Sequence, residues 1–266
     1  MTRPTGDDGP DDPIVRLLRR AGCVFADEEA ALLREHTTSA TELDALCARR
    51  VAGVPIEHLV GWVQFGELRL SVGPGVFVPR QRSLLLARTA IAAADACRSP
   101  TVVEAFCGVA PIAASVAAAV PGVELHVVDA DDTALGFARR NLPGGTGIHL
   151  GAGLVPLPAA LRGRLDVIAA VPPYVPESAL GLLAPEARDH EPHRALLGGR
   201  DGLDHITALI ADARRWLAVG GELLIEMNTA QYDLVAVAPP TRAHYECEVV
   251  AGDDGQTAVA RLRRAR

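Results

Sequence analysis

Beyond Pro79, apolar runs of strand type alternate with stretches of helical spacing, and this alternation limits the fold more than any other feature. Such alternation is typical of a mostly parallel, doubly wound α/β sheet. Only Gly252–Gly255 separates the last two runs, which predicts an antiparallel hairpin. A long loop is expected between 175 and 202. The expected strands are 101–106, 123–129, a short one near 148, 166–171, 222–227, 245–250 and 257–262, and the main helices are 83–96, 111–120, 131–141 and 203–217.

The chain before Pro79 has a different character. Residues 1–12 are acidic and rich in Gly and Pro, which predicts a disordered tail. Apolar residues recur at helical spacing over 13–53, which predicts about three helices, with Asp27 and Thr41 as N-caps. Glycines punctuate short β-like pieces in 54–78, which predicts a β-hairpin linker. We therefore divide the chain into 1–12, 13–53, 54–78 and an α/β domain, 79–266.

Composition excludes several classes of function. The formal net charge is −7, which disfavours broad binding to nucleic-acid phosphates. All 26 basic residues are arginines, so Schiff-base and P-loop lysine chemistry is excluded. The five cysteines form no CxxC pair, so neither a metal site nor a disulfide framework is predicted. Because we find no signal peptide and no apolar stretch that could span a membrane, we expect a cytoplasmic protein.

A glycine-bearing turn joins the strand 101–106 to a helix that begins at Pro111, a residue suited to the first helical turn. The amides around Val109 would form a partial positive end, ready to bind a carboxylate. The next strand ends in Asp129, where an acid typically bonds a ribose diol, although Asp129 could equally cap the next helix. Glu104 is a further candidate, since an acid on a buried strand is costly without a partner. Together they predict a nucleoside-bearing cofactor.

The strand 166–171 ends abruptly in Pro172-Pro173, and Tyr174 follows at once. Two prolines fix two φ angles and remove two N–H donors. The turn is therefore stiff, presents bare carbonyls and projects Tyr174 from the carboxyl end of a strand, where ligands bind in open α/β sheets. Such a turn suits holding a flat, NH-bearing group while something is added to it.

The order of these pieces resembles the class I S-adenosylmethionine-dependent methyltransferases, and within them the protein-(glutamine-N5) methyltransferases that modify release factors. This resemblance implies a seven-stranded, mostly parallel Rossmann-like sheet with an antiparallel C-terminal hairpin. It also implies S-adenosylmethionine as cofactor and a small N-terminal helical domain, 13–53, that recognises the substrate. The matching segments are 55–61, 78–83, 103–115, 128–129, 171–174, 191–202 and 220–226, with Gln231.

The resemblance also assigns roles to single residues. The residues that it implies for orienting the methyl acceptor are Val171, Pro172, Pro173 and Tyr174. The residues that it implies for binding the cofactor are Glu104, Phe106, Cys107, Gly108, Val109, Ala110, Asp129, Ala130, Ala152 and Gly153. No metal ion is implied.

The sequence departs from the family's pattern at three places. Phe106 and Ala110 stand at two of its three glycine positions, and we expect Ala110 to cost little if its φ is negative. Ala152 stands where the family often has an acid. Val171 replaces an asparagine whose side-chain oxygen accepts an N–H of the acceptor in the family. Because valine accepts no hydrogen bond, we expect a loss of about 10²–10³ in rate.

Three functions remain open. The first is an N-methyltransferase that acts on an amide or amine nitrogen, either a release-factor glutamine or another acceptor such as a small molecule. The second is a binding or scaffold protein that has lost catalysis, since the departures fall at contact points. The third is a DNA amino-methyltransferase, because a related Pro-Pro-Tyr motif occurs there, although the acidic charge makes nucleic acid an unfavoured partner. The oligomeric state stays open.

Overall fold

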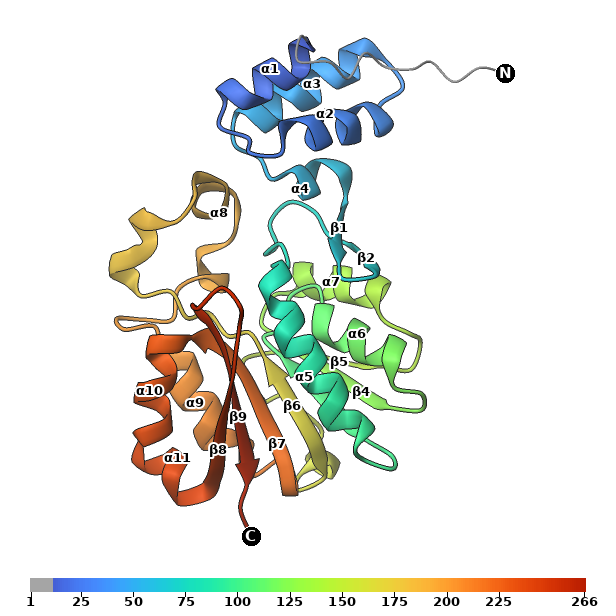
Figure 1. Cartoon of the computed structure of the whole chain (residues 1–266). Coiled ribbons are helices and arrows are strands. Elements are labelled where there is room, and N and C mark those ends of the chain that lie inside the picture. The colour runs from blue at the N-terminus through green and yellow to red at the C-terminus, as the bar shows by residue number, and fades with distance from the viewer. Residues whose placement is uncertain (1–11) are drawn as a thin grey trace.

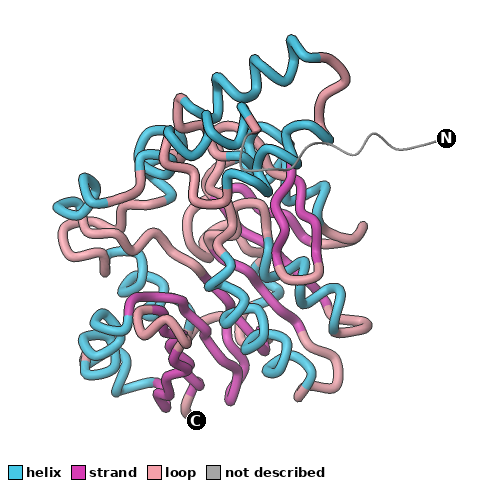
Figure 2. Tube along the Cα trace, turned by 45° about the horizontal axis from the view of Figure 1, so that its top comes forward, coloured by secondary structure: helices cyan, strands magenta, loops and turns pink. Residues whose placement is uncertain are grey.

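The computed structural model describes residues 12–266. Figure 1 shows N-terminal helices set apart from a larger α/β part, with a short helix and a β-hairpin between them. Figure 2 shows the strands of the larger part as a central layer with helices and loops around it. No helix within residues 12–266 is long and apolar enough to cross a membrane.

The N-terminal helices are α1 (Pro13–Arg20), α2 (Ala26–Glu35), α3 (Ala40–Val51) and the short α4 (Ile56–Val60). Their core is small and contains Leu18, Leu33 and Cys47, all buried. The division into domains at residues 53 and 78 stays a prediction.

Three local predictions about these helices were wrong. Asp12, assigned to the tail, is buried; its carboxylate accepts the Ile14 N–H at 2.9 Å and pairs with Arg34 at 2.5 Å. Residues 1–11, the rest of the predicted tail, lie outside the described residues. Ser39 caps α3 in place of Thr41, because its hydroxyl accepts the Glu42 N–H at 3.2 Å. Asp27 lies inside the first turn of α2, which has no side-chain cap.

Strands β1 (Trp62–Phe65) and β2 (Leu68–Ser71) pair as an antiparallel hairpin. Val63, Phe65 and Leu70 are buried and join the core of the α/β part. The hairpin therefore packs its apolar side chains on the α/β part and follows the N-terminal helices in the chain.

The large sheet has seven strands in the order β5-β4-β3-β6-β7-β9-β8. The pairs from β5 to β7 are parallel, while β9 is antiparallel to both β7 and β8. This confirms the predicted class of fold. The strand order reverses between β3 and β6, which makes their carboxyl ends the expected place for a ligand. The bounds are β3 Thr101–Ala105, β4 Glu124–Asp129, β5 Gly147–Leu150, β6 Leu165–Ala170, β7 Leu217–Asn228, β8 Tyr245–Ala251 and β9 Thr257–Arg264.

Helices cover both faces of the sheet and bury a separate apolar core on each (Figure 1). The helices on one face are α5 (Leu84–Asp95), α6 (Pro111–Ala119) and α7 (Asp132–Asn141), and those on the other are α9 (Asp204–Ala213), α10 (Thr229–Val237) and α11 (Pro239–His244). Helix α9 is shorter than predicted because Leu217 already pairs with Leu165 as the first residue of β7. Gly221 lies inside that strand, where an added Cβ would meet the Leu165 carbonyl oxygen at 2.7 Å.

The segment 175–200, called the strap below, was expected to be a loop and instead contains η3 (Glu177–Leu182), α8 (Pro185–His190) and η4 (His193–Ala195). Ion pairs hold it to both other parts of the chain. Glu186 pairs with the buried Arg50 of α3 at 2.6 Å, and Glu191 pairs with Arg80 at 2.7 Å. The strap therefore links the N-terminal helices to the segment that precedes α5.

Candidate active site

A cavity of about 840 Å³ opens at the carboxyl ends of β3, β4 and β6. Its volume lies within the range of small-molecule sites, about 300–1,000 Å³. All four residues predicted to orient an acceptor line it, and so do nine of the ten predicted to bind a cofactor; Ala110 does not. The structure therefore brings together two groups of residues from turns that lie far apart in the sequence.

The turn after β3 follows a backbone path that glycine favours. Phe106, Gly108 and Ala110 have φ values of +54°, +53° and +63°, all in the left-handed region. The condition for a low cost at Ala110, a negative φ, is therefore not met. A non-glycine residue in this region costs about 1–2 kcal/mol because its Cβ crowds the following carbonyl. The turn thus keeps its shape at the expense of strain at Phe106 and Ala110.

Buried Glu104 takes the place that we expected a ligand's carboxylate to occupy at the start of α6. Its two carboxylate oxygens accept the Ile112 N–H at 3.3 Å and the Ala113 N–H at 2.6 Å. Burial raises the pKa of Glu104 to about 8, although these two donors act in the opposite direction. The helix end is therefore satisfied by the protein itself.

Asp129 lies at the end of β4 and lines the cavity. Its carboxylate accepts the Gly108 N–H at 2.7 Å and the Asp131 N–H at 2.9 Å. Burial raises the pKa of the Asp129 carboxyl, and both N–H donors oppose that shift. Each oxygen has a further lone pair, so the carboxylate can still accept hydroxyl groups. Asp129 does not cap α7, because Asp131 does so by accepting the Thr133 N–H at 3.0 Å.

The Pro-Pro-Tyr turn is held from behind. Gln231 of α10 donates to the Tyr174 carbonyl at 3.0 Å. Gly198 packs so closely that a Cβ there would meet the Pro173 carbonyl oxygen at 2.4 Å. Burial raises the pKa of the Tyr174 phenol, and the Arg82 guanidinium lies 6.0 Å from the centre of its ring. The backbone of the turn is therefore held in place, and Val171 and Tyr174 line the cavity.

The strap supplies ten of the lining residues that were not predicted as site residues from the sequence. Arg194 crosses to Asp131 at 2.7 Å and so links the strap to the start of α7. The long loop that carries His190 and His193 was expected to pack against the cofactor site or the N-terminal helices, but its individual lining residues were not predicted. The strap residues in the lining are Val175, Leu183, Ala184, Glu186, Ala187, Pro192, Arg194, Ala195, Leu196 and Leu197.

Within residues 12–266, no group of three His, Cys, Asp or Glu side chains is arranged to hold a metal ion. The two strap histidines have other partners. His190 contacts the Ala52 carbonyl at 3.3 Å, and His193 contacts the Arg188 carbonyl at 2.9 Å.

The residues present fit a nucleoside-bearing methyl donor. The cavity lies across the carboxyl ends of the adjacent parallel strands β3 and β4. Asp129, at the end of β4, has lone pairs free to accept hydroxyl groups, and the diproline turn lines the same cavity. With the antiparallel β9 next to β7, these features define the class I methyltransferase fold. A methyltransferase structure from Pyrococcus furiosus shares this fold: its TM-score is 0.55 at 15% identity, and the match covers 82% of this chain and 98% of that one.

No family model matches the chain, but curated relatives identify it. It is 38% identical over 206 residues to the release factor glutamine methyltransferase of Streptomyces coelicolor, and this match covers 74% of this chain and 72% of the relative. It is 31% identical over 267 residues to that of Deinococcus radiodurans, which covers 93% and 95%. The chain therefore belongs to the release factor glutamine methyltransferase family and is an S-adenosylmethionine-dependent methyltransferase. The resemblance seen in the sequence is confirmed.

Proposed function

We propose that this protein transfers a methyl group from S-adenosylmethionine to the side-chain amide nitrogen of a glutamine in a release factor. The observation that carries the proposal is the shared cavity, which the Asp129 end of β4 and the Pro172-Pro173-Tyr174 turn both line. Family membership supports the same acceptor, because the relatives are named for it. A cytoplasmic location follows, since release factors act on cytoplasmic ribosomes.

The donor supplies an electrophilic methyl group on a sulfonium sulfur. The protein contributes position and alignment, which methyl transfer needs more than acid–base groups. In this proposal Asp129 accepts the ribose hydroxyls, while the Phe106–Ala110 turn and the Ala152-Gly153 loop enclose the rest of the donor. Tyr174 stacks on the flat amide, and the Pro172 carbonyl accepts one of its N–H groups.

The domain division has a functional side. We assign recognition of the release factor to the helices of 13–53, with 54–78 as the linker and 79–266 as the catalytic part. Two observations support this: α3 reaches the strap through Arg50 and Glu186 at 2.6 Å, and strap residues line the cavity. A protein bound to these helices would therefore be connected, through the Arg50–Glu186 ion pair, to the strap residues that line the cavity.

Val171 favours a second class of acceptor. A nitrogen with one N–H, as in a secondary amine of a small molecule, would need only the Pro172 carbonyl and would leave no donor facing the valine side chain. A methylation assay with a release factor distinguishes the two classes of acceptor.

The test is to incubate the purified protein with S-adenosylmethionine and a release factor, and to map methylation by peptide mass spectrometry. We expect one methyl group on a single glutamine, and none when that glutamine is replaced by alanine. If the protein binds S-adenosylmethionine but the release factor stays unmethylated, the proposed acceptor is wrong and the small-molecule class takes its place.

A further inference from the structure

Glu226 lies at the carboxyl end of β7, directly beside the diproline turn. Ala170 of β6 pairs with Ile225, so the next residues in register are Val171 and Glu226. Leu224 and Val171 pack in the core on one face of the sheet, whereas Ile225 belongs to the core on the other face. Because side chains alternate along a strand, Glu226 shares the face of Val171.

Neither carboxylate oxygen of Glu226 has a hydrogen-bond partner, although the side chain is only 1% exposed. The Nε atom of Arg82 lies 3.6 Å from one oxygen, too far for a hydrogen bond. A buried acid without hydrogen bonds destabilises the fold that contains it. Glu226 is therefore a group whose position needs a reason other than stability.

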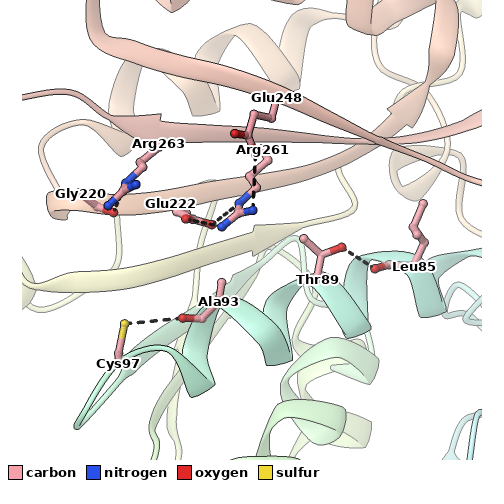
Figure 3. Close-up of polar contacts among 9 residues, drawn as sticks. All are labelled: Leu85, Thr89, Ala93, Cys97, Gly220, Glu222, Glu248, Arg261 and Arg263. Carbon is pink, nitrogen blue, oxygen red and sulfur yellow. Dashed lines mark hydrogen bonds and ion pairs between the residues drawn. The ribbon is translucent and has the colours of Figure 1, made fainter.

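Glu222 shows that the strand can satisfy such an acid. It lies four residues earlier on the same face, and Arg261 donates to its two oxygens at 2.7 and 2.8 Å. Figure 3 shows this pair with Glu248 on the far side of Arg261. The two glutamates on this face therefore differ in their partners: Arg261 donates to both oxygens of Glu222, whereas Glu226 has only the Arg82 ion pair at 3.6 Å.

We propose that Glu226 accepts the N–H of the methyl acceptor for which Val171 offers no partner, and that it takes the proton which the nitrogen loses. This inference rests on the proposed function. Glu226 does not line the cavity in this structure, but its neighbours Arg82, Ser83 and Val171 do. Arg82 is about half exposed, at 48%, so its side chain has room to move away and open the Glu226 carboxylate to the acceptor.

The step balances without a further reagent. The nitrogen lone pair forms the N–C bond to the methyl carbon as the S–C bond breaks, and sulfur keeps that electron pair as a neutral thioether. The nitrogen then carries one proton too many, which passes to the Glu226 carboxylate and from there to water. Glu226 supplies both the orienting acceptor and the proton acceptor, roles that valine at 171 cannot fill.

The experiment compares Glu226→Leu with the matched control Glu222→Leu. If Glu226 is retained for function, E226L removes an unsatisfied buried acid, so the Tm should rise by about 2–8 °C. E222L breaks a hydrogen-bonded pair, so its Tm should fall. With the release factor as acceptor, E226L should lower kcat by about 10²-fold while the Kd for S-adenosylmethionine stays unchanged, and folded E222L should keep the wild-type kcat.

A fall in Tm for E226L similar to that of E222L would assign Glu226 a structural role and overturn the inference. Transfer at the wild-type rate by E226L would overturn it as well. If the wild-type protein methylates no release factor, the proposed acceptor fails on its own. The thermal comparison then still decides whether Glu226 is held unsatisfied for a function.

Discussion

The turn after β3 and the turn after β6 line the same cavity, and each departs from the family's sequence pattern in a different way. In the first turn Phe106 and Ala110 replace glycines, yet the backbone keeps positive φ values at both positions. In the second turn the prolines and Tyr174 remain, and only the side chain of Val171 differs. The first departure keeps the backbone conformation of the turn and adds strain to it. The second keeps the turn and changes the chemical character of the side chain at position 171.

This difference separates two kinds of effect. Strain at Phe106 and Ala110 destabilises the folded chain but leaves the proposed cofactor-binding surface in place. The absence of a hydrogen-bond acceptor at Val171 leaves the fold intact. In the proposed function it removes a group that would orient the reacting nitrogen, so it lowers the rate. Mutations in the first turn should therefore move stability, and mutations in the second should move the rate.

The largest effect is expected at position 171. In a Glu226→Leu background, Val171→Asn should raise kcat for a glutamine acceptor by about 10²-fold, because the asparagine oxygen restores the missing acceptor of an N–H. In the wild-type background the gain should stay below about tenfold, since Glu226 already accepts that group. Single-turnover transfer to a release factor measures both. Equal gains in the two backgrounds would show that the two side chains act independently.

The next largest effect concerns the cofactor. Asp129→Ala removes charged hydrogen bonds to the ribose and should weaken S-adenosylmethionine binding by about 10–100-fold. Asp132→Ala is the control, because Asp132 is an exposed acid in the first turn of α7. Isothermal titration calorimetry gives both dissociation constants. Unchanged affinity in the Asp129 variant would remove Asp129 from the binding site.

A smaller effect on stability is expected in the first turn. Ala110→Gly relieves a left-handed φ and should stabilise the fold by about 1 kcal/mol, which raises the Tm by about 2–4 °C. Ala117→Gly, in the ordinary helical part of α6, should have the opposite sign. Differential scanning calorimetry of both variants compares them. A lower Tm for Ala110→Gly would mean that Ala110 is not strained.

The smallest effect is a pH dependence. Burial raises the pKa of Glu104 from its ordinary 4.5 to about 8, so the folded state holds this proton more tightly than the unfolded state. The stability that results is fully present below pH 4.5 and is lost as the pH rises toward about 8. Glu104→Gln should therefore flatten the fall of Tm between these values. A steeper fall in the variant would assign Glu104 a lowered pKa.

Much of this architecture could be predicted from the sequence. The alternation beyond Pro79 gave the sheet and its hairpin, and the abrupt end at Pro172 located the second turn. The spacing of apolar residues and the effects of proline on the backbone are local, so they can be recognised directly in the sequence. The positions of Asp129 and Tyr174 on one cavity followed from parallel strands having their carboxyl ends at the same edge.

The remaining features depend on contacts between distant residues. The strap helices are short and held by pairs such as Arg50–Glu186, which no local pattern indicates. The strand was expected to begin at residue 222, but β7 begins at Leu217, which pairs with Leu165, and it continues through Gly221. The unsatisfied state of Glu226 is a property of its surroundings, so the sequence gives no sign of it.

The most direct test of the central claim is a crystal structure of the protein with S-adenosylhomocysteine. The claim is that both turns act on one bound donor. We expect the ribose hydroxyls within hydrogen-bonding distance of the Asp129 carboxylate, and the sulfur directed toward Val171 and Pro172. Ribose density away from Asp129, or a sulfur that faces away from the diproline turn, would contradict it.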